Sequence, residues 1–183
     1  IHPDRTGLLV TRWQRAYVLL FAVTLTVYAV MLLWSLPAIT AAAGGLPPFD
    51  LRPGGYTAEQ ARAFLAALSP AGVAFYRTVQ HRLDLFYPAL LAATLFFGIA
   101  RLLPQRLGAW RWICAAPTVL VAAFDYAENA SVAAMLAAGP DLSEELVHRA
   151  SNWTVLKSGV TTVAMVAVLV LLLWRGFAWW QSR

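Results

Sequence analysis

Four long apolar runs constrain the fold of this chain more than any other feature of its sequence. They cover about residues 16–36, 83–103, 112–138 and 153–174. Each holds about 20 residues or more, and a helix of that length crosses the hydrocarbon core of a bilayer. Because backbone polar groups in lipid must be hydrogen-bonded within their own segment, each run is expected to be a helix. The sequence predicts an all-α polytopic membrane protein, a four-transmembrane-helix bundle that forms one domain over residues 1–183.

The composition supports this class and excludes a soluble globular domain. Hydrophobic residues make up 60% of the chain, charged residues make up only 13%, and the mean hydropathy is +0.63. The formal net charge of +5 does not indicate a nucleic-acid partner, because the arginines lie at the ends of the apolar runs rather than on one basic face. The expected partners are membrane lipids or a lipophilic small molecule, and a homo-oligomer or a partner membrane subunit stays open.

The distribution of charge predicts the orientation of the four spans. Arginines precede the first span, fill the short link between the second and third, and follow the fourth. The link between the third and fourth spans instead holds Asp141, Glu144 and Glu145 against a single Arg149. Because positively charged loops stay on the cytoplasmic side, both termini are expected to be cytoplasmic.

The segment 37–82 is expected to form an extracytoplasmic cap. Its first half is rich in proline and glycine from Pro37 onward, so we expect the first span to end there. Thr57 and Gln60 have the spacing of a capping box, which predicts a short amphipathic helix over about 58–68.

A further helix is expected to begin at Ser69, with Pro70 in its first turn, and to run to about Leu103. Pro88 should kink this helix and leave the backbone carbonyl of Asp84, one turn earlier, without its helical partner.

The third span carries three polar residues near its middle. Asp125, Glu128 and Asn129 have the spacing i, i+3 and i+4, so they share one helix face. Two carboxylates this close do not both ionise easily at low dielectric. Three interpretations remain open: a helix-packing network, a site that moves protons or acts on a ligand, and a bound cation.

Lys157, the only lysine of the chain, lies about one turn into the fourth span. Its ammonium group can extend out to water, pair with an acid, or react unprotonated as a Schiff-base lysine. We favour a pair, either with Asp84 at a similar depth or with Asp125 and Glu128 if the side chain points inward.

These polar residues are the candidate site. The candidate catalytic residues are Asp125, Glu128 and Lys157. The candidate ligand-binding residues are Gln80, Asp84, Tyr87, Asn129 and Asn152. Those on the second span recur at three- and four-residue spacing, which places them on one face.

The sequence predicts no metal site and specifies no cofactor. The histidines His2, His81 and His148 lack the spacing of metal-ligand motifs and fall outside the four spans. The single cysteine, Cys114, excludes an internal disulfide and a cysteine-based metal cluster.

Several strings of the chain resemble an uncharacterised group of bacterial four-span membrane proteins. They are GGYTAEQARAFLAALSPAGVAFYRTVQ, LDLFYPALL and FDYAENASVAAML, followed by the lone lysine of the fourth span, and they extend over about residues 50–160. The resemblance implies the four-span architecture, a bacterial inner membrane location and the same polar residues. It implies no reaction.

Three functions are compatible with the sequence. In the first, a buried polar pocket that opens to the outer leaflet binds or processes a lipophilic molecule by acid–base chemistry. In the second, the chain is a non-catalytic membrane subunit or scaffold whose buried charges fix helix packing or hold a partner helix. The third is a small proton-coupled transporter. Whether the protein is an enzyme therefore stays open.

Overall fold

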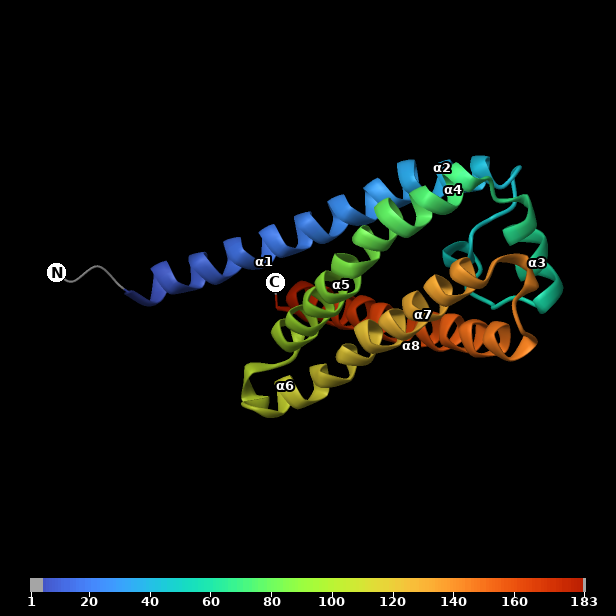
Figure 1. The fold of residues 1–183 in the computed structure, drawn as a ribbon. Helices are drawn as coiled ribbons and strands as arrows, with labels where there is room; N and C mark the ends of the chain where they lie inside the picture. The colour runs from blue at the N-terminus through green and yellow to red at the C-terminus, as the bar shows by residue number, and fades with distance from the viewer. Residues whose placement is uncertain (1–4, 183) are drawn as a thin grey trace.

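The computed structural model describes residues 5–182 of the chain, and side chains from residue 12 onward. His2 lies outside the described residues. Residues 5–182 are mostly helical and contain no strand, which confirms the all-α class (Figure 1). Four helical runs are long and apolar enough to cross a membrane: Arg12–Ala42, Pro70–Leu102, Trp110–Asp141 and Glu144–Gln181.

The first two of these runs and the segment between them comprise the following elements: α1 (Arg5–Val30), the π-helical turn η1 (Met31–Ser35), α2 (Leu36–Ala42), η2 (Phe49–Leu51), α3 (Ala58–Ala67), α4 (Pro70–Phe75), the π-helical turn η3 (Tyr76–Gln80) and α5 (His81–Leu102). The remaining elements are η4 (Gln105–Leu107), α6 (Trp110–Ala115), η5 (Ala116–Thr118), α7 (Val119–Ala138), η6 (Gly139–Asp141) and α8 (Glu144–Gln181).

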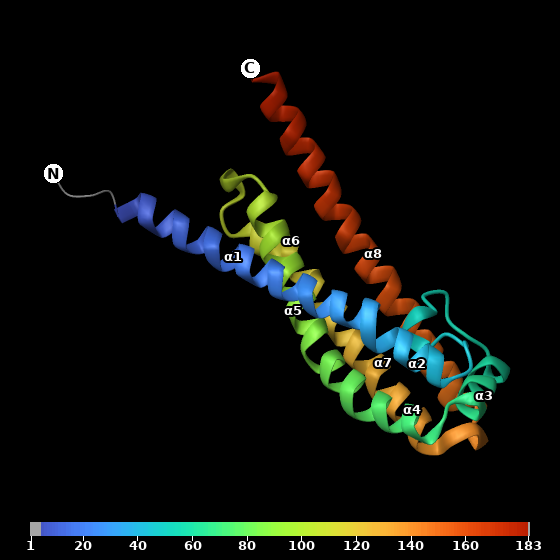
Figure 2. The same cartoon turned by 90° about the horizontal axis from the view of Figure 1, so that it is seen from above.

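The long helices run antiparallel, so the two ends of the molecule differ. The start of α1, the end of α8 and the turn between α5 and α6 lie at one end, here called the termini end, and α3 and the turn between α7 and α8 lie at the other, the cap end (Figure 1). Helix α7 packs against both α5 and α8, and α1 packs on α5. Helices α1 and α8 spread apart toward the termini end (Figure 2).

The first membrane-length helix does not end at Pro37, and that prediction is wrong. The chain stays helical to Ala42 because the turn Met31–Ser35 widens to π geometry directly before the proline. Pro37 then lies in the first turn of α2, where its missing N–H and its ring are tolerated.

The local helix starts agree with the sequence. Thr57 Oγ1 accepts from the Gln60 N–H at 3.2 Å, and Gln60 Oε1 accepts from the Thr57 N–H at 3.0 Å, so the capping box of α3 is complete. Ser69 caps α4 by accepting from the Gly72 N–H at 3.1 Å. Ser143 caps α8 in the same way.

An aromatic core at the cap end holds α3 and the proline-rich loop onto the bundle. Phe49 and Phe64 are fully buried, with ring centroids 4.9 Å apart, and Tyr56 and Tyr76 pack around them. Burial of one such ring stabilises a fold by about 3–5 kcal/mol relative to alanine. The cap is therefore packed as a fixed lid over the polar residues described next.

Candidate functional site

Buried polar side chains from six elements and a loop meet at the cap-end half of the bundle. We call this set the polar cluster: Ser35, Asp50, Tyr56, Tyr76, Gln80, Asp84, Asp125, Glu128, Asn129, Thr154 and Lys157. Polar groups this deep in an apolar bundle are costly unless they are paired or hydrogen-bonded, so their partners decide what the cluster can do.

Lys157 pairs with the two acids of α7. Its ammonium nitrogen lies 3.7 Å from Asp125 Oδ1 and forms a closer ion pair with Glu128. Glu128 is 1% exposed, and its other oxygen accepts from Thr154 Oγ1 at 2.5 Å. The match follows from helix geometry, because Asp125 and Glu128, at i and i+3, share one face of α7, and α7 packs against α8. The lysine therefore points into the bundle, and its ammonium bridges both carboxylates.

Asp84 has a different set of partners from the one expected. Its Oδ1 accepts from Gln80 Nε2 at 2.9 Å, and Gln80 Oε1 accepts from Ser35 Oγ at 2.7 Å. The ion pair of the lysine is thus with α7, while Asp84 joins a hydrogen-bonded chain that reaches η1. Ser35 was missed because it precedes Pro37, where the first helix was expected to end.

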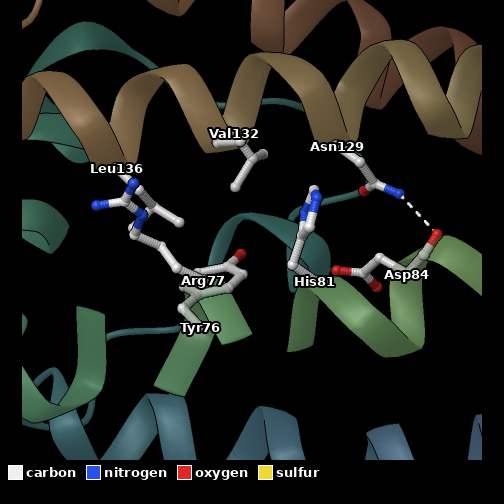
Figure 3. Close-up of a pocket in the computed structure, with 8 residues that line it drawn as sticks. Tyr76, Arg77, His81, Asp84, Asn129, Val132 and Leu136 are labelled. Carbon is white, nitrogen blue, oxygen red and sulfur yellow. Dashed lines mark hydrogen bonds between the residues drawn. The ribbon is translucent and has the colours of Figure 1, made fainter. Parts of the chain in front are cut away.

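The carbonyl predicted to lose its helical partner has found another. The backbone oxygen of Asp84 accepts from Asn129 Nδ2 at 3.2 Å, four residues before Pro88 (Figure 3). Asn129 also lies one turn from Asp125 on the same face of α7. Its amide therefore links α7 to the backbone of α5, while the Asp84 carboxyl group keeps Gln80 as its partner.

Asp50 is the acidic member of the cluster that sequence reasoning missed. It lies in the short turn η2 of the cap, and the Tyr76 hydroxyl donates a hydrogen bond to its carboxylate. Asp50 interacts electrostatically with Asp84, Glu128 and Lys157, among others. The one signal in the sequence is an acid between two apolar residues, Phe49-Asp50-Leu51, in an otherwise proline- and glycine-rich loop.

Tyr56 brings the cap into contact with α8. Its backbone N–H donates to Ser151 Oγ at 2.9 Å, and its ring is 8% exposed. Burial raises the pKa of the Tyr56 hydroxyl well above its ordinary value, so the group stays neutral beside Thr154 and Glu128.

The two remaining candidate residues, Tyr87 and Asn152, differ in burial and in contact with the cluster. Tyr87 is half-buried, stacks on Tyr28 with ring centroids 5.8 Å apart, and lies close enough to Asp125 and Lys157 to interact with them electrostatically. Asn152 is exposed, and its neighbours on α8 contact the cap and the cluster instead. The structure therefore does not bring Asn152 to the candidate site.

A pocket of about 190 Å³ opens between η3–α5 and α7 and reaches the polar cluster from the side. Its lining comprises Tyr76, Arg77, His81, Asp84, Asn129, Val132, Ala133 and Leu136 (Figure 3). Asp84 and Asn129 form its polar floor, and α7 supplies its apolar wall. Asp125, Glu128 and Lys157 are not among these lining residues, so they stand behind the pocket rather than in it.

The cluster holds more acid than base. Four carboxyl groups, from Asp50, Asp84, Asp125 and Glu128, belong to the cluster, and its one ammonium group pairs with two of them, Asp125 and Glu128. One ammonium group does not compensate the three buried carboxyl groups of Asp84, Asp125 and Glu128 together, so these three can share exchangeable protons. Among the residues that the structure describes, no three His, Cys, Asp or Glu side chains converge as metal ligands would.

Comparison with known proteins assigns this chain to no family, because no protein-family model, curated protein or solved structure matches it.

Proposed function

We propose that this chain is an integral membrane protein that binds a lipophilic molecule with a small polar head group and acts on it by acid–base chemistry. The observation that carries the proposal is the pocket between α5 and α7, because it joins an apolar wall to a carboxyl group and an amide. Such a mixed lining, with fixed polar groups beside the apolar residues Val132 and Leu136, suits a small amphiphile with a polar head group.

The proposed orientation places the cap end on the outer side of a bacterial inner membrane and both termini in the cytoplasm. The charge asymmetry of the loops supports it. In this orientation, Arg77 and His81 at the exposed mouth of the pocket lie toward the outer leaflet, where a head group enters.

The pocket lining makes Asp84 the carboxyl group that touches the ligand. Asp125, Glu128 and Lys157 support it from behind, because Asn129, one turn from Asp125 on α7, holds the backbone carbonyl of Asp84. Asp84 serves as the general acid or base, and the ion pair behind it fixes the charge and position of its neighbours.

Mass spectrometry of lipophilic molecules that co-purify with the protein tests the proposal. We expect wild type to retain one specific species, and Asp84→Asn to retain at least about tenfold less of it, as for loss of a hydrogen bond from a buried carboxyl group. Asp141→Asn is the matched control, because it removes an exposed carboxyl in the turn between α7 and α8.

Glu128→Gln separates direct from indirect roles. This variant should retain the species, with a smaller loss than Asp84→Asn, because Glu128 lies behind the pocket. Identical lipid profiles for wild type, Asp84→Asn and Glu128→Gln would contradict a ligand site.

A second candidate function is that of a non-catalytic membrane subunit, and one observation favours it. The main polar contacts of the cluster join two different elements: α7 to α8 through Lys157, α5 to α7 through Asn129, and η2 to η3 through Asp50. Such contacts hold helices in register. Alanines on α7, of which Ala130 and Ala134 are exposed, offer a face for a partner helix. Isolation of a stable monomer with a filled pocket would count against this alternative.

A further inference from the structure

A second and larger pocket lies at the termini end, far from the polar cluster along the helices. It has a volume of about 620 Å³ and lies between α1, α5, α6 and α8, where α1 and α8 spread apart (Figure 2). Its lining comprises Trp13, Ala16, Tyr17, Leu20, Phe97, Ala100, Arg101, Gln105, Arg111, Trp112 and Arg175.

The charged groups of this pocket all have the same sign. Arg101 comes from the last turn of α5, Arg111 from the start of α6, and Arg175 from α8. No carboxylate lines the pocket among the described side chains, whose salt bridges instead involve Arg62 and Lys157. Three guanidinium groups from three helices therefore face one space without an acid to neutralise them.

The Arg111 guanidinium group contacts a tryptophan ring, and one of its N–H donors has no hydrogen-bond partner among the described residues. Its guanidinium carbon lies 5.0 Å from the centroid of the Trp112 ring, a cation–π distance. Its Nε is buried and has no hydrogen-bond partner among the described residues. A buried donor without a partner is costly, and a planar guanidinium group matches phosphate oxygens in geometry and charge.

The rest of the lining is apolar and aromatic. Leu20 and Phe97 extend the pocket along α1 and α5 toward the middle of the bundle. A free phosphate ion, as a possible ligand, has no apolar part that could contact this apolar lining, whereas the acyl chain of a lipid could pack against it. Helix α8 buries only 6% of its most apolar window and α1 only 11%, which leaves space between them open to hydrocarbon.

We propose that this pocket binds an anionic phospholipid, with its phosphate among Arg101, Arg111 and Arg175 and an acyl chain between α1 and α8. The lipid fills the space that the two spread helices leave and neutralises the three arginines. This site is independent of the proposed function, since it shares no residue with the polar cluster.

Photo-cross-linking on the full chain in detergent tests the proposal. The probe is a phosphatidylglycerol with a diazirine in its acyl chain, and phosphatidylcholine with the same label is the zwitterionic comparison. We expect phosphatidylglycerol to label peptides that contain Leu20 and Phe97 at least about fivefold more than phosphatidylcholine does. Unlabelled phosphatidylglycerol should compete, and glycerol 1-phosphate, which lacks acyl chains, should not.

Variants identify the groups that bind the phosphate. Arg111→Gln and Arg175→Gln should each reduce labelling about fivefold, as expected for the loss of one arginine near an anionic lipid. Arg106→Gln is the matched control, because Arg106 lies in η4 close by but is not part of the lining. Equal labelling by both lipids in wild type would overturn the proposal, and so would competition by glycerol 1-phosphate or an equal loss in Arg106→Gln.

Discussion

Lys157 supplies the positive charge that compensates the buried acids of the polar cluster. Its ammonium compensates Glu128 and Asp125 at a depth where an uncompensated carboxylate is expensive. Removing one partner of a buried ion pair costs much more than the pair itself contributes, because the other charge is left behind. The lysine is therefore expected to be essential only while its acids are present.

A double-variant cycle tests this dependence. Lys157→Met should destabilise the protein by about 3–5 kcal/mol, seen as a lower midpoint of thermal unfolding in detergent. Lys157→Met combined with Glu128→Gln should reverse at least half of the decrease in the unfolding midpoint, because the fully buried carboxylate is gone. Arg62→Met is the control, since the exposed pair of Arg62 with Glu144, 3.8 Å apart, contributes at most about 1 kcal/mol. A double variant as unstable as Lys157→Met would contradict the cycle.

Gly55 is the residue that allows the cap to approach α8. Its φ is +85°, and a Cβ atom at this position would lie 2.6 Å from Ser151 Oγ. The next residue, Tyr56, donates its N–H to the same Ser151 oxygen. A side chain at position 55 would therefore be strained in itself and would push the loop away from the helix.

Gly55→Ala should lower the free energy of unfolding by about 1–3 kcal/mol, the usual cost of a strained backbone position. Gly54→Ala is a matched control one residue away, because its added Cβ meets nothing within 4 Å and its φ is not positive. Thermal unfolding of both variants in detergent provides the measurement. Equal midpoints for Gly54→Ala and Gly55→Ala would show that the close approach to Ser151 does not matter.

At the scale of elements, the packing of α1 on α5 depends on small and hydroxylated residues. Thr24 and Thr94 place their hydroxyl oxygens 2.8 Å apart across the interface. About two turns before Thr24 on α1, the Tyr17 hydroxyl donates to the Thr94 carbonyl at 3.4 Å and lies close to Gly98. Helices associate closely in membranes where such small residues let the backbones approach.

Gly98→Ala should loosen this interface, because the added Cβ would lie 2.7 Å from the Tyr17 hydroxyl oxygen. Tyr17→Phe in the same chain should restore the midpoint of thermal unfolding, since the next nearest atom of the ring is 3.7 Å away. Gly159→Ala, with nothing within 4 Å, should be neutral or slightly stabilising as a helix-favouring change. A double variant that stays as unstable as Gly98→Ala would rule out the tyrosine contact as the cause.

The elements that sequence alone predicts well are those stabilised by local contacts. The capping box of α3 and the serine cap of α4 involve partners three residues apart, so their patterns are visible in the sequence. The predicted end of the first span was wrong because the π-helical turn at Met31–Ser35, which accommodates Pro37, has no local sequence pattern of its own. Its buried Ser35 is instead bonded to Gln80, 45 residues away.

The candidate site was likewise predictable only where it depends on helix spacing and topology. Spacing on α7 and antiparallel topology were sufficient to expect a lysine–acid pair, and Pro88 was sufficient to expect the free Asp84 carbonyl. The contribution of Asp50 was not, since it depends on how a loop with seven prolines and glycines folds back onto η3. Asn152 was also predicted to be part of the site and does not reach it, because adjacent residues on a helix such as α8 point about 100° apart.

At the scale of the whole molecule, the two ends differ in charge and in packing. The cap end carries the aromatic core and the acidic cluster, and the termini end carries the arginine-lined pocket between spread helices. Much of the surface of α1 and α8 consists of large exposed hydrophobic side chains, such as Leu19, Val163 and Leu173. An exposed apolar surface of this extent is stable only in contact with lipid or with other chains.

The proposed orientation predicts which end reacts with a reagent that cannot cross the membrane. In a Cys114→Ser background, Glu59→Cys places a thiol on the exposed face of α3 at the cap end, and Arg106→Cys places one in the turn between α5 and α6. A charged maleimide should label the cap thiol in intact spheroplasts and the Arg106→Cys thiol only after lysis. The arginine-rich link between α5 and α6 is the physical reason, because such links stay on the cytoplasmic side. Labelling of Arg106→Cys in intact spheroplasts would reverse the orientation, and would then place the pocket at Asp84 toward the cytoplasmic leaflet.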